Sequence, residues 1–206
     1  GLRYGRAAYQ AQLGQIRAGA AYSHMRYRLG EDFAALQARG TASIASVSAS
    51  YPWLRSRHHN LTALANFDAK TLRDEAGAVG TRAEKSARVG MLGLNGSTTE
   101  MGNNALSTLS LAWYSGDLAL EGASALASDA ATLRSDGRFN KLSLQATHQR
   151  DLGAGWALSA SLRIQFASRN LDTSEKMSLG GADGVRAYPS GEAFGDQGSL
   201  LNLELR

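Results

Sequence analysis

The residues with the clearest chemical potential lie in one Gly-rich segment, residues 178–198, which reads SLGGADGVRAYPSGEAFGDQG. Its central tetrad is Val185, Arg186, Ala187 and Tyr188, and three glycines precede it: Gly180, Gly181 and Gly184. The glycines allow tight turns with positive φ, while the arginine and tyrosine supply a fixed charge and an amphipathic ring. A segment of this length between strand-like sequences is predicted to be a functional or a disordered loop.

Familiar catalytic and ligand-binding patterns are absent from the sequence. His58 and His59 stand beside arginines, with no partner at metal-ligand spacing. The acids of the Gly-rich segment, Asp183, Glu192 and Asp196, lack the spacing of a calcium loop. Neither G-K-[ST] nor G-x-S-x-G occurs. We therefore predict no active site, no metal, no cofactor and no enzymatic activity.

Composition narrows the class of protein further. The 206 residues are 43% hydrophobic, include no cysteine and carry a net charge of +4, with the basic residues scattered. Disulfides and thiolate metal sites are thereby excluded. No run approaches the roughly 18 apolar residues of a transmembrane helix. Without a basic patch, nucleic acid is not an expected partner.

The elements that must position the Gly-rich segment are strands, because apolar and polar residues alternate through most of the chain. Every second side chain from Trp156 to Phe166 is apolar, and the intervening ones are mainly polar. A period of two indicates strands and excludes helices. About nine strands are predicted, near 1–13, 16–29, 40–53, 60–75, 86–97, 104–119, 138–151, 155–170 and 198–206.

Strand and loop lengths favour a transmembrane β-barrel over a soluble antiparallel sheet, which alternation alone also fits. Several segments reach the roughly 9–11 residues of a tilted membrane strand. Short connections near 14–15, 54–59, 98–103 and 152–154 alternate with longer ones at 30–39, 76–85, 120–137 and 171–197, as periplasmic turns alternate with extracellular loops. Aromatic residues near strand ends match an interfacial girdle: Tyr51, Trp53, Trp113, Tyr114 and Trp156.

The polar face would line a wet lumen. Its predicted members are Asn66, Asp68, Lys70, Lys141, Gln145, Arg163, Gln165, Arg169 and Glu204. The carboxylates of Asp68 and Glu204 would pair with Lys70, Arg163 or Arg206. An odd number of strands leaves open edges, which are costly in lipid, and both chain ends look cut. Residues 1–206 are therefore interpreted as one partial barrel domain, all-β and antiparallel.

The tetrad at 185–188 resembles the V-R-G-[YF] signature of the TpsB transporters, outer-membrane barrels of the hemolysin-activator type in the BamA-like superfamily. The resemblance is most specific over 174–206 and includes 22–30 and 50–61. In that family two POTRA domains precede a sixteen-stranded barrel, and the signature lies in the sixth extracellular loop. The resemblance implies strands four to twelve here, without the POTRA domains and the first and last barrel strands.

The same resemblance implies roles for the tetrad. Arg186 would point into the lumen and pair with an acid beyond Arg206, since a guanidinium makes strong bidentate bonds to a carboxylate. The ring of Tyr188 would pack against loop or lumen groups. Ala187 departs from the usual glycine, and a positive φ there would cost alanine free energy.

The function that the resemblance implies is two-partner secretion: a monomeric channel of the Gram-negative outer membrane that translocates one large exoprotein without nucleotide. Its partners would be a TpsA-like secreted cargo and outer-membrane lipid. Two alternatives stay open. One is a BamA-like or TamA-like insertase of membrane barrels, and the other is a passive porin or ligand-binding barrel.

Overall fold

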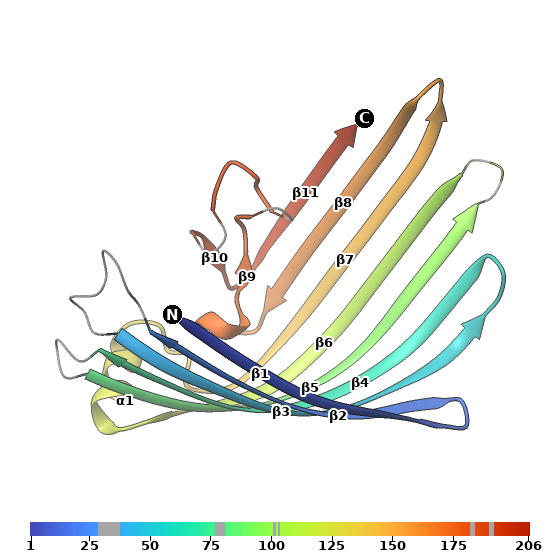
Figure 1. Cartoon of the computed structure of the whole chain (residues 1–206). Coiled ribbons are helices and arrows are strands. Elements are labelled where there is room, and N and C mark those ends of the chain that lie inside the picture. The colour runs from blue at the N-terminus through green and yellow to red at the C-terminus, as the bar shows by residue number, and fades with distance from the viewer. Residues whose placement is uncertain (29–37, 77–80, 101, 103, 182–183, 190–191) are drawn as a thin grey trace. The chain divides into compact units, whose positions relative to one another are not determined.

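One antiparallel sheet holds most of the strands (Figure 1). The computed structural model describes residues 1–28, 38–76, 81–100, 102, 104–181, 184–189 and 192–206. Within them the sheet order is β1-β2-β3-β4-β5-β6-β7-β8-β11, which confirms the predicted nine neighbouring strands. The bounds are Leu2–Leu13 (β1), Ile16–Arg28 (β2), Ala38–Arg55 (β3), His59–Ala76 (β4), Thr81–Glu100 (β5), Ala105–Glu121 (β6), Gly137–Gly153 (β7), Trp156–Ala167 (β8) and Gly198–Leu205 (β11).

The strand registers separate apolar from polar side chains as the alternation predicts. Leu144 on β7 lies opposite Ile164 on β8, and Gln145 lies opposite Arg163. On the other side of β8, Glu204 of β11 lies opposite Ser159. Residues opposite one another in antiparallel strands point to the same face. We call the face with Gln145, Arg163 and Glu204 the inner face and the opposite one the outer face.

The outer face is apolar and open. Its exposed large side chains include Tyr9, Val47, Trp53, Phe67, Trp113, Trp156, Phe166, Leu201 and Leu203. Trp53 and Trp156 lie near the short turns, where a girdle is expected. Trp113 lies in the middle of β6, and Tyr114 lies beneath the Lys141 ammonium on the inner face. The prediction that these two residues belong to a girdle at the strand ends is therefore wrong.

Contacts between residues divide the chain into two compact units, and several long strands contribute residues to both. The first comprises Gly1–Ala49, Asn66–Gly90 and Ser115–Phe139, and the second comprises Ser50–Ala65, Met91–Tyr114 and Asn140–Arg206. All of β8, β11 and the Gly-rich segment belong to the second unit. The predicted loop and the strands that face it are thus part of one compact unit.

The connections differ from the prediction in two places. The loop predicted at 76–85 is shorter because β5 begins at Thr81, and 77–80 lies outside the described residues. The start of β5 is polar and is held to β4 by an ion pair, in which Arg73 Nε lies 2.8 Å from Glu84 Oε1. The connection at 120–137 contains an unpredicted helix, α1 (Ala123–Ala131). No helix in the described part of the chain is long and apolar enough to cross a membrane.

The connection that contains α1 is organised by the buried carboxylate of Asp129. Its Oδ1 accepts hydrogen bonds from the Ser135 backbone N–H (3.0 Å) and from the Ser135 hydroxyl (2.7 Å). Its Oδ2 accepts from the Asp136 backbone N–H (3.0 Å), and the Asp136 side chain accepts from the Leu120 N–H (2.9 Å). These bonds close the end of α1 onto the start of β7.

Replacing Asp129 by alanine should loosen this connection. The substitution removes three hydrogen bonds to a charged acceptor, each of which contributes about 1.5–3 kcal/mol. We expect protease added to intact cells to cut residues 122–136 roughly ten times faster or more. The exposed Asp117 on β6 provides the control, and Asp117→Ala should be cut at the wild-type rate. Equal cleavage of all three proteins would contradict this role of Asp129.

Candidate functional site

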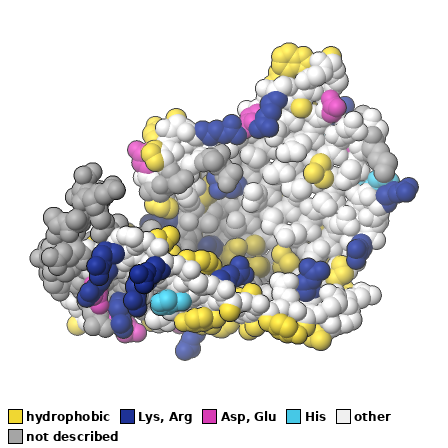
Figure 2. Space-filling view, viewed as in Figure 1, with side chains coloured by type: hydrophobic (Ala, Val, Ile, Leu, Met, Phe, Trp, Pro, Cys, Tyr) yellow, Lys and Arg dark blue, Asp and Glu magenta, His cyan; other side chains and the backbone are white. Residues whose placement is uncertain are grey.

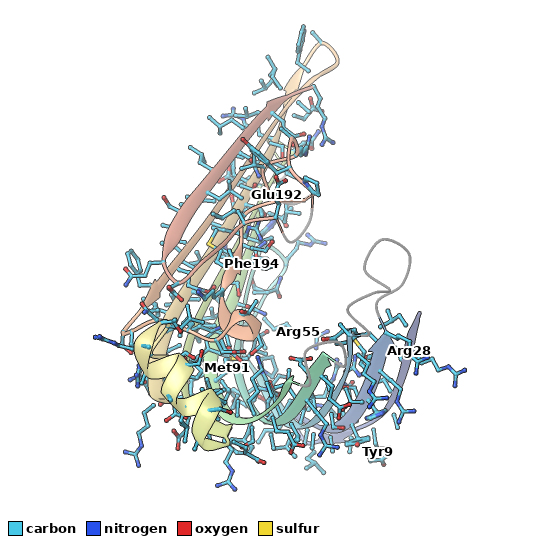
Figure 3. All side chains as sticks on the ribbon, turned by 90° about the vertical axis from the view of Figure 1, so that its left-hand side faces the viewer. Tyr9, Arg28, Arg55, Met91, Glu192 and Phe194 are labelled. Carbon is cyan, nitrogen blue, oxygen red and sulfur yellow. The ribbon has the colours of Figure 1, made fainter. Side chains whose placement is uncertain are left out.

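The Gly-rich segment folds onto the inner face of β7, β8 and β11 (Figures 1 and 3). We call residues 168–197 the inner loop. It contains a 3-10 turn, η3 (Thr173–Glu175), and two short strands, β9 (Met177–Ser178) and β10 (Phe194–Gly195), which pair with each other. Figure 3 shows Glu192 and Phe194 on the returning half of the loop. The described part of the loop is therefore ordered and attached to the strands.

The base of the inner loop is fixed by a buried ion pair. Lys141 Nζ on β7 lies 2.8 Å from Glu175 Oε2, and the two side chains are only 10% and 5% exposed. The same ammonium donates to the Glu175 carbonyl oxygen (3.0 Å) and lies 4.6 Å from the centre of the Tyr114 ring. Burial of a charge is costly unless it is paired and hydrogen-bonded. Both members of this pair meet that condition.

Gln165 on β8 joins the two halves of the loop. Its side-chain amide donates to the carbonyl oxygens of Asp196 (3.0 Å) and Glu175 (3.4 Å). The Asp196 carboxylate accepts from the Leu171 N–H (2.8 Å) and lies 3.4 Å from Lys176 Nζ. Leu171 is one of the most deeply buried side chains in the described structure. The outgoing and returning segments are thus held together over the strand surface.

These contacts correct part of the predicted lumen. Lys141 and Gln165 do not line an open, wet path, because the inner loop covers them. Arg169 lies in the loop, since β8 ends at Ala167. Gln145 is exposed and Arg163 is half-buried on the inner face. In the first unit Asn66, Asp68 and Lys70 alternate with exposed neighbours on β4, and Asn66 Nδ2 donates to Asp68 Oδ1 (2.8 Å).

The three predicted glycines allow the turn before the tetrad. Gly181 has a φ of 101°, which favours glycine. A Cβ at Gly180 or Gly184 would collide with the main-chain carbonyl of Pro189 or Leu179, respectively. This close approach lets the Val185 N–H donate to the Leu179 carbonyl oxygen (2.8 Å), beside a parallel bridge between Gly180 and Val185. Asp183 lies outside the described residues.

Arg186 points to the wall of the inner face and pairs with Glu204 on β11. Glu204 is thus its acidic partner among the described residues, and the predicted acid beyond Arg206 stays a prediction. Glu204 is half-buried on the inner face, within reach of the loop, and it also binds Arg206 through Nη2 (2.6 Å) and Nε (3.0 Å). The pairing of Glu204 with Arg206 agrees with the sequence prediction. One carboxylate thus receives two guanidinium groups.

The other members of the tetrad act mainly through the main chain. Ala187 does not have a positive φ, so alanine is accommodated there without strain. Tyr188 donates through its N–H to the Val185 carbonyl (3.1 Å) and accepts from the Gly181 N–H (3.0 Å). Tyr188 is 55% exposed, and the predicted packing of its ring against loop or lumen groups stays a prediction. Val185 is exposed as well.

Sequence reasoning missed Glu175 as the acid that anchors the loop. It adjoins the fragment K-M-S-L-G-G in sequence, but nothing in its spacing indicates a partner 34 positions away on β7. Asp196 was weighed only as a calcium ligand, whereas it accepts a backbone N–H and pairs with Lys176. Among the described residues, no three His, Cys, Asp or Glu side chains come close enough to hold a metal ion.

Comparison with known proteins identifies relatives of this fold and sequence. A family model described as haemolysin secretion/activation protein ShlB/FhaC/HecB matches residues 6–206. Heme/hemopexin transporter protein HuxB of Haemophilus influenzae (strain 86-028NP) is 26% identical over 190 residues, which cover 92% of this chain and 34% of HuxB. HuxB of strain ATCC 51907 is 25% identical with the same coverage.

Solved structures show the same fold. CdiB from Escherichia coli matches with a TM-score of 0.77 and 20% identity, over 99% of this chain and 38% of that chain. CdiB from Acinetobacter baumannii matches with a TM-score of 0.67 and 19% identity, over 99% and 36%. The chain therefore spans about a third of the length of the curated relatives and solved structures that it matches.

Replacing Glu175 by alanine should destabilise the barrel, because it leaves the Lys141 ammonium buried without its carboxylate. Breaking a buried pair in this way costs about 3–5 kcal/mol. The change would be measured by urea unfolding of the purified full-length protein in lipid vesicles. The control is Arg39→Ala, which removes an exposed pair with Glu75 and should cost about 1 kcal/mol or less. The double variant Lys141→Met/Glu175→Leu should recover most of the loss. Similar stability of Glu175→Ala and wild type would contradict the anchoring role.

Proposed function

Because the chain belongs to the ShlB/FhaC/HecB family of haemolysin secretion/activation proteins, we propose that it forms part of a channel for protein secretion. It is a segment of a β-barrel in the outer membrane of a Gram-negative bacterium. The channel would carry one large exoprotein, in an extended state, from the periplasm to the outside. The observation that carries this proposal is the family match over residues 6–206.

The chemistry of the inner face supports passage of an extended chain. Several of its polar side chains satisfy one another across strands, as Thr108 does with Thr147 (2.6 Å) and Ser110 with Asn95 (2.8 Å). When the hydrogen-bond donors and acceptors of a wall are already paired, binding a passing peptide brings little gain in free energy. Gln145 and Arg163 add further polar groups to this face. Such a surface is wet and has low affinity.

The inner loop would set the state of the channel. Its base is fixed by Lys141 and Glu175, and its tip is fixed by the contact of Arg186 with Glu204. The tip contact is exposed, since the Arg186 side chain is 63% exposed, and it is therefore the weaker of the two attachments. We assign to Arg186 the role of keeping the loop on the barrel wall in the conducting barrel.

The channel would work without catalysis. Folding of the exoprotein outside the cell would give translocation its direction, and no nucleotide would be consumed. The relative HuxB is a heme/hemopexin transporter protein, which supports a transport role for this chain. The cargo proposed here is defined by class only, as a secreted TpsA-like exoprotein.

Two other functions predict different effects when the gene is deleted from cells. An insertase of the BamA or TamA type acts on many membrane barrels, whereas a passive porin or ligand-binding barrel needs no dedicated protein partner. Deletion of the full-length gene distinguishes them. We expect a single large exoprotein to disappear from the medium while the levels of other outer-membrane barrels stay normal. Loss of many barrels, or unchanged secretion of every exoprotein, would overturn the proposal.

Substitution of Arg186 by alanine should reduce secretion of that exoprotein by more than it reduces the amount of barrel in the outer membrane. An exposed pair contributes about 1 kcal/mol or less to stability, so the barrel should still fold. Arg206→Ala is the matched control, because Arg206 binds the same carboxylate from the residue after β11 and not from the loop. Equal secretion by the Arg186 and Arg206 variants would remove the assignment of Arg186 to the channel state.

A further inference from the structure

Two arginines face each other across β1 and β2 on the outer face. The register places Arg3 opposite Arg26, and Arg28 follows two residues later on the same face. Like charges directly opposite one another destabilise an antiparallel pair. None of these three guanidiniums has an ion-pair partner among the described residues, and all three are exposed. An anion lying between them would offset this repulsion.

The neighbouring strands extend this group of charges. Arg39 of β3 and Arg73 of β4 line the same hollow of about 660 Å³ as Arg3, Arg26 and Arg28. Arg39 pairs with Glu75 at 2.6 Å, and Arg73 pairs with Glu84 at 2.8 Å. Figure 2 shows basic side chains gathered at the lower left of the view, beside an apolar band. All these residues belong to the first unit, and among the described residues five arginines stand against the two carboxylates of Glu75 and Glu84.

The position of the cluster along the strands matches a membrane surface. The outer face of the β1–β2 pair carries Leu13 and Ile16 at the short turn, then Tyr9 and Tyr22, and finally Arg3 and Arg26. Tyrosine prefers the boundary between hydrocarbon and headgroups. Four residues separate Tyr22 from Arg26, which is about 13 Å along a strand and about 9 Å along the membrane normal at a 45° tilt. The arginines therefore lie at the level of the headgroups.

The lengths of the connections between strands indicate which side of the membrane the arginine cluster faces. The short turns at 14–15, 56–58 and 154–155 lie at one end of the strands, and the cluster lies at the other end, where the connections are longer. In outer-membrane barrels the longer loops are extracellular. The cluster consequently meets the outer leaflet, which in Gram-negative bacteria consists of phosphorylated glycolipid. Arginine suits this partner because its planar donor groups match phosphate in bidentate geometry.

We propose that Arg3, Arg26 and Arg28, with Arg39 and Arg73 beside them, form a binding site for the phosphate groups of an outer-leaflet glycolipid. The hollow takes the phosphorylated headgroup, while Tyr9 and Tyr22 contact the sugar–acyl boundary below it. The bound phosphate offsets the repulsion between Arg3 and Arg26. All residues of this site belong to the first unit and none to the inner loop, so the site is independent of the secretion proposal.

The test uses the purified full-length protein in detergent micelles, with bisphosphorylated lipid A as the probe and native mass spectrometry as the readout. The triple variant Arg3→Gln/Arg26→Gln/Arg28→Gln should bind lipid A about 100-fold more weakly, at about 1 kcal/mol for each arginine. The matched control is Arg17→Gln/Arg55→Gln/Arg57→Gln, which removes three exposed arginines near the short turns. That control should retain the affinity of the wild type.

Two further arms use only the unaltered protein, so the test does not depend on folding of the variant. Dephosphorylated lipid A should bind much more weakly than the bisphosphorylated form, and inorganic phosphate at the same concentration should not displace the lipid. Equal binding of both lipid forms, full displacement by inorganic phosphate, or wild-type binding by a folded triple variant would each overturn the proposal.

Discussion

A strand that crosses lipid must leave no main-chain N–H or C=O group without a partner, because the hydrocarbon offers none. This constraint decides the rest of the structure. It requires long antiparallel strands in register, as between β1 and β2 and, up to an irregularity between Asp151 and Gly153, between β7 and β8. The register in turn fixes which side chains meet lipid and which meet the inner face, since a shift by one residue would exchange them. The apolar outer face and the polar inner face therefore follow from one requirement of the main chain.

The inner loop satisfies the same requirement by other means. Its described residues form only two short strands, and side chains of the wall satisfy several of its polar groups: Lys141 for Glu175, and Gln165 for the carbonyls of Glu175 and Asp196. Its glycines complete this arrangement, because only a residue without a Cβ lets the carbonyls of Leu179 and Pro189 come so close. A loop of this kind is attached to the barrel by the wall residues as much as by its own sequence.

The sequence predicts the strands well and the loop only partly. Period-two alternation identifies the strands and their faces, because each residue of a membrane strand must suit either lipid or the inner face. At the ends of the strands that rule weakens, and the polar start of β5 and the helix α1 were not predicted. Gly180, Gly181 and Gly184 were predicted from backbone freedom alone. The partner of Arg186 and the role of Glu175 were not, since both depend on contacts between residues distant in sequence.

The carboxylate of Glu204 binds one guanidinium from the loop and one from its own strand. When Arg186 leaves, Arg206 remains, so the acid never faces the inner space without a counter-ion. The loop tip can thus exchange its bond for water at little electrostatic cost, while the dry pair at its base persists. A segment attached in this way resembles a latch, held firmly at its base and lightly at its tip.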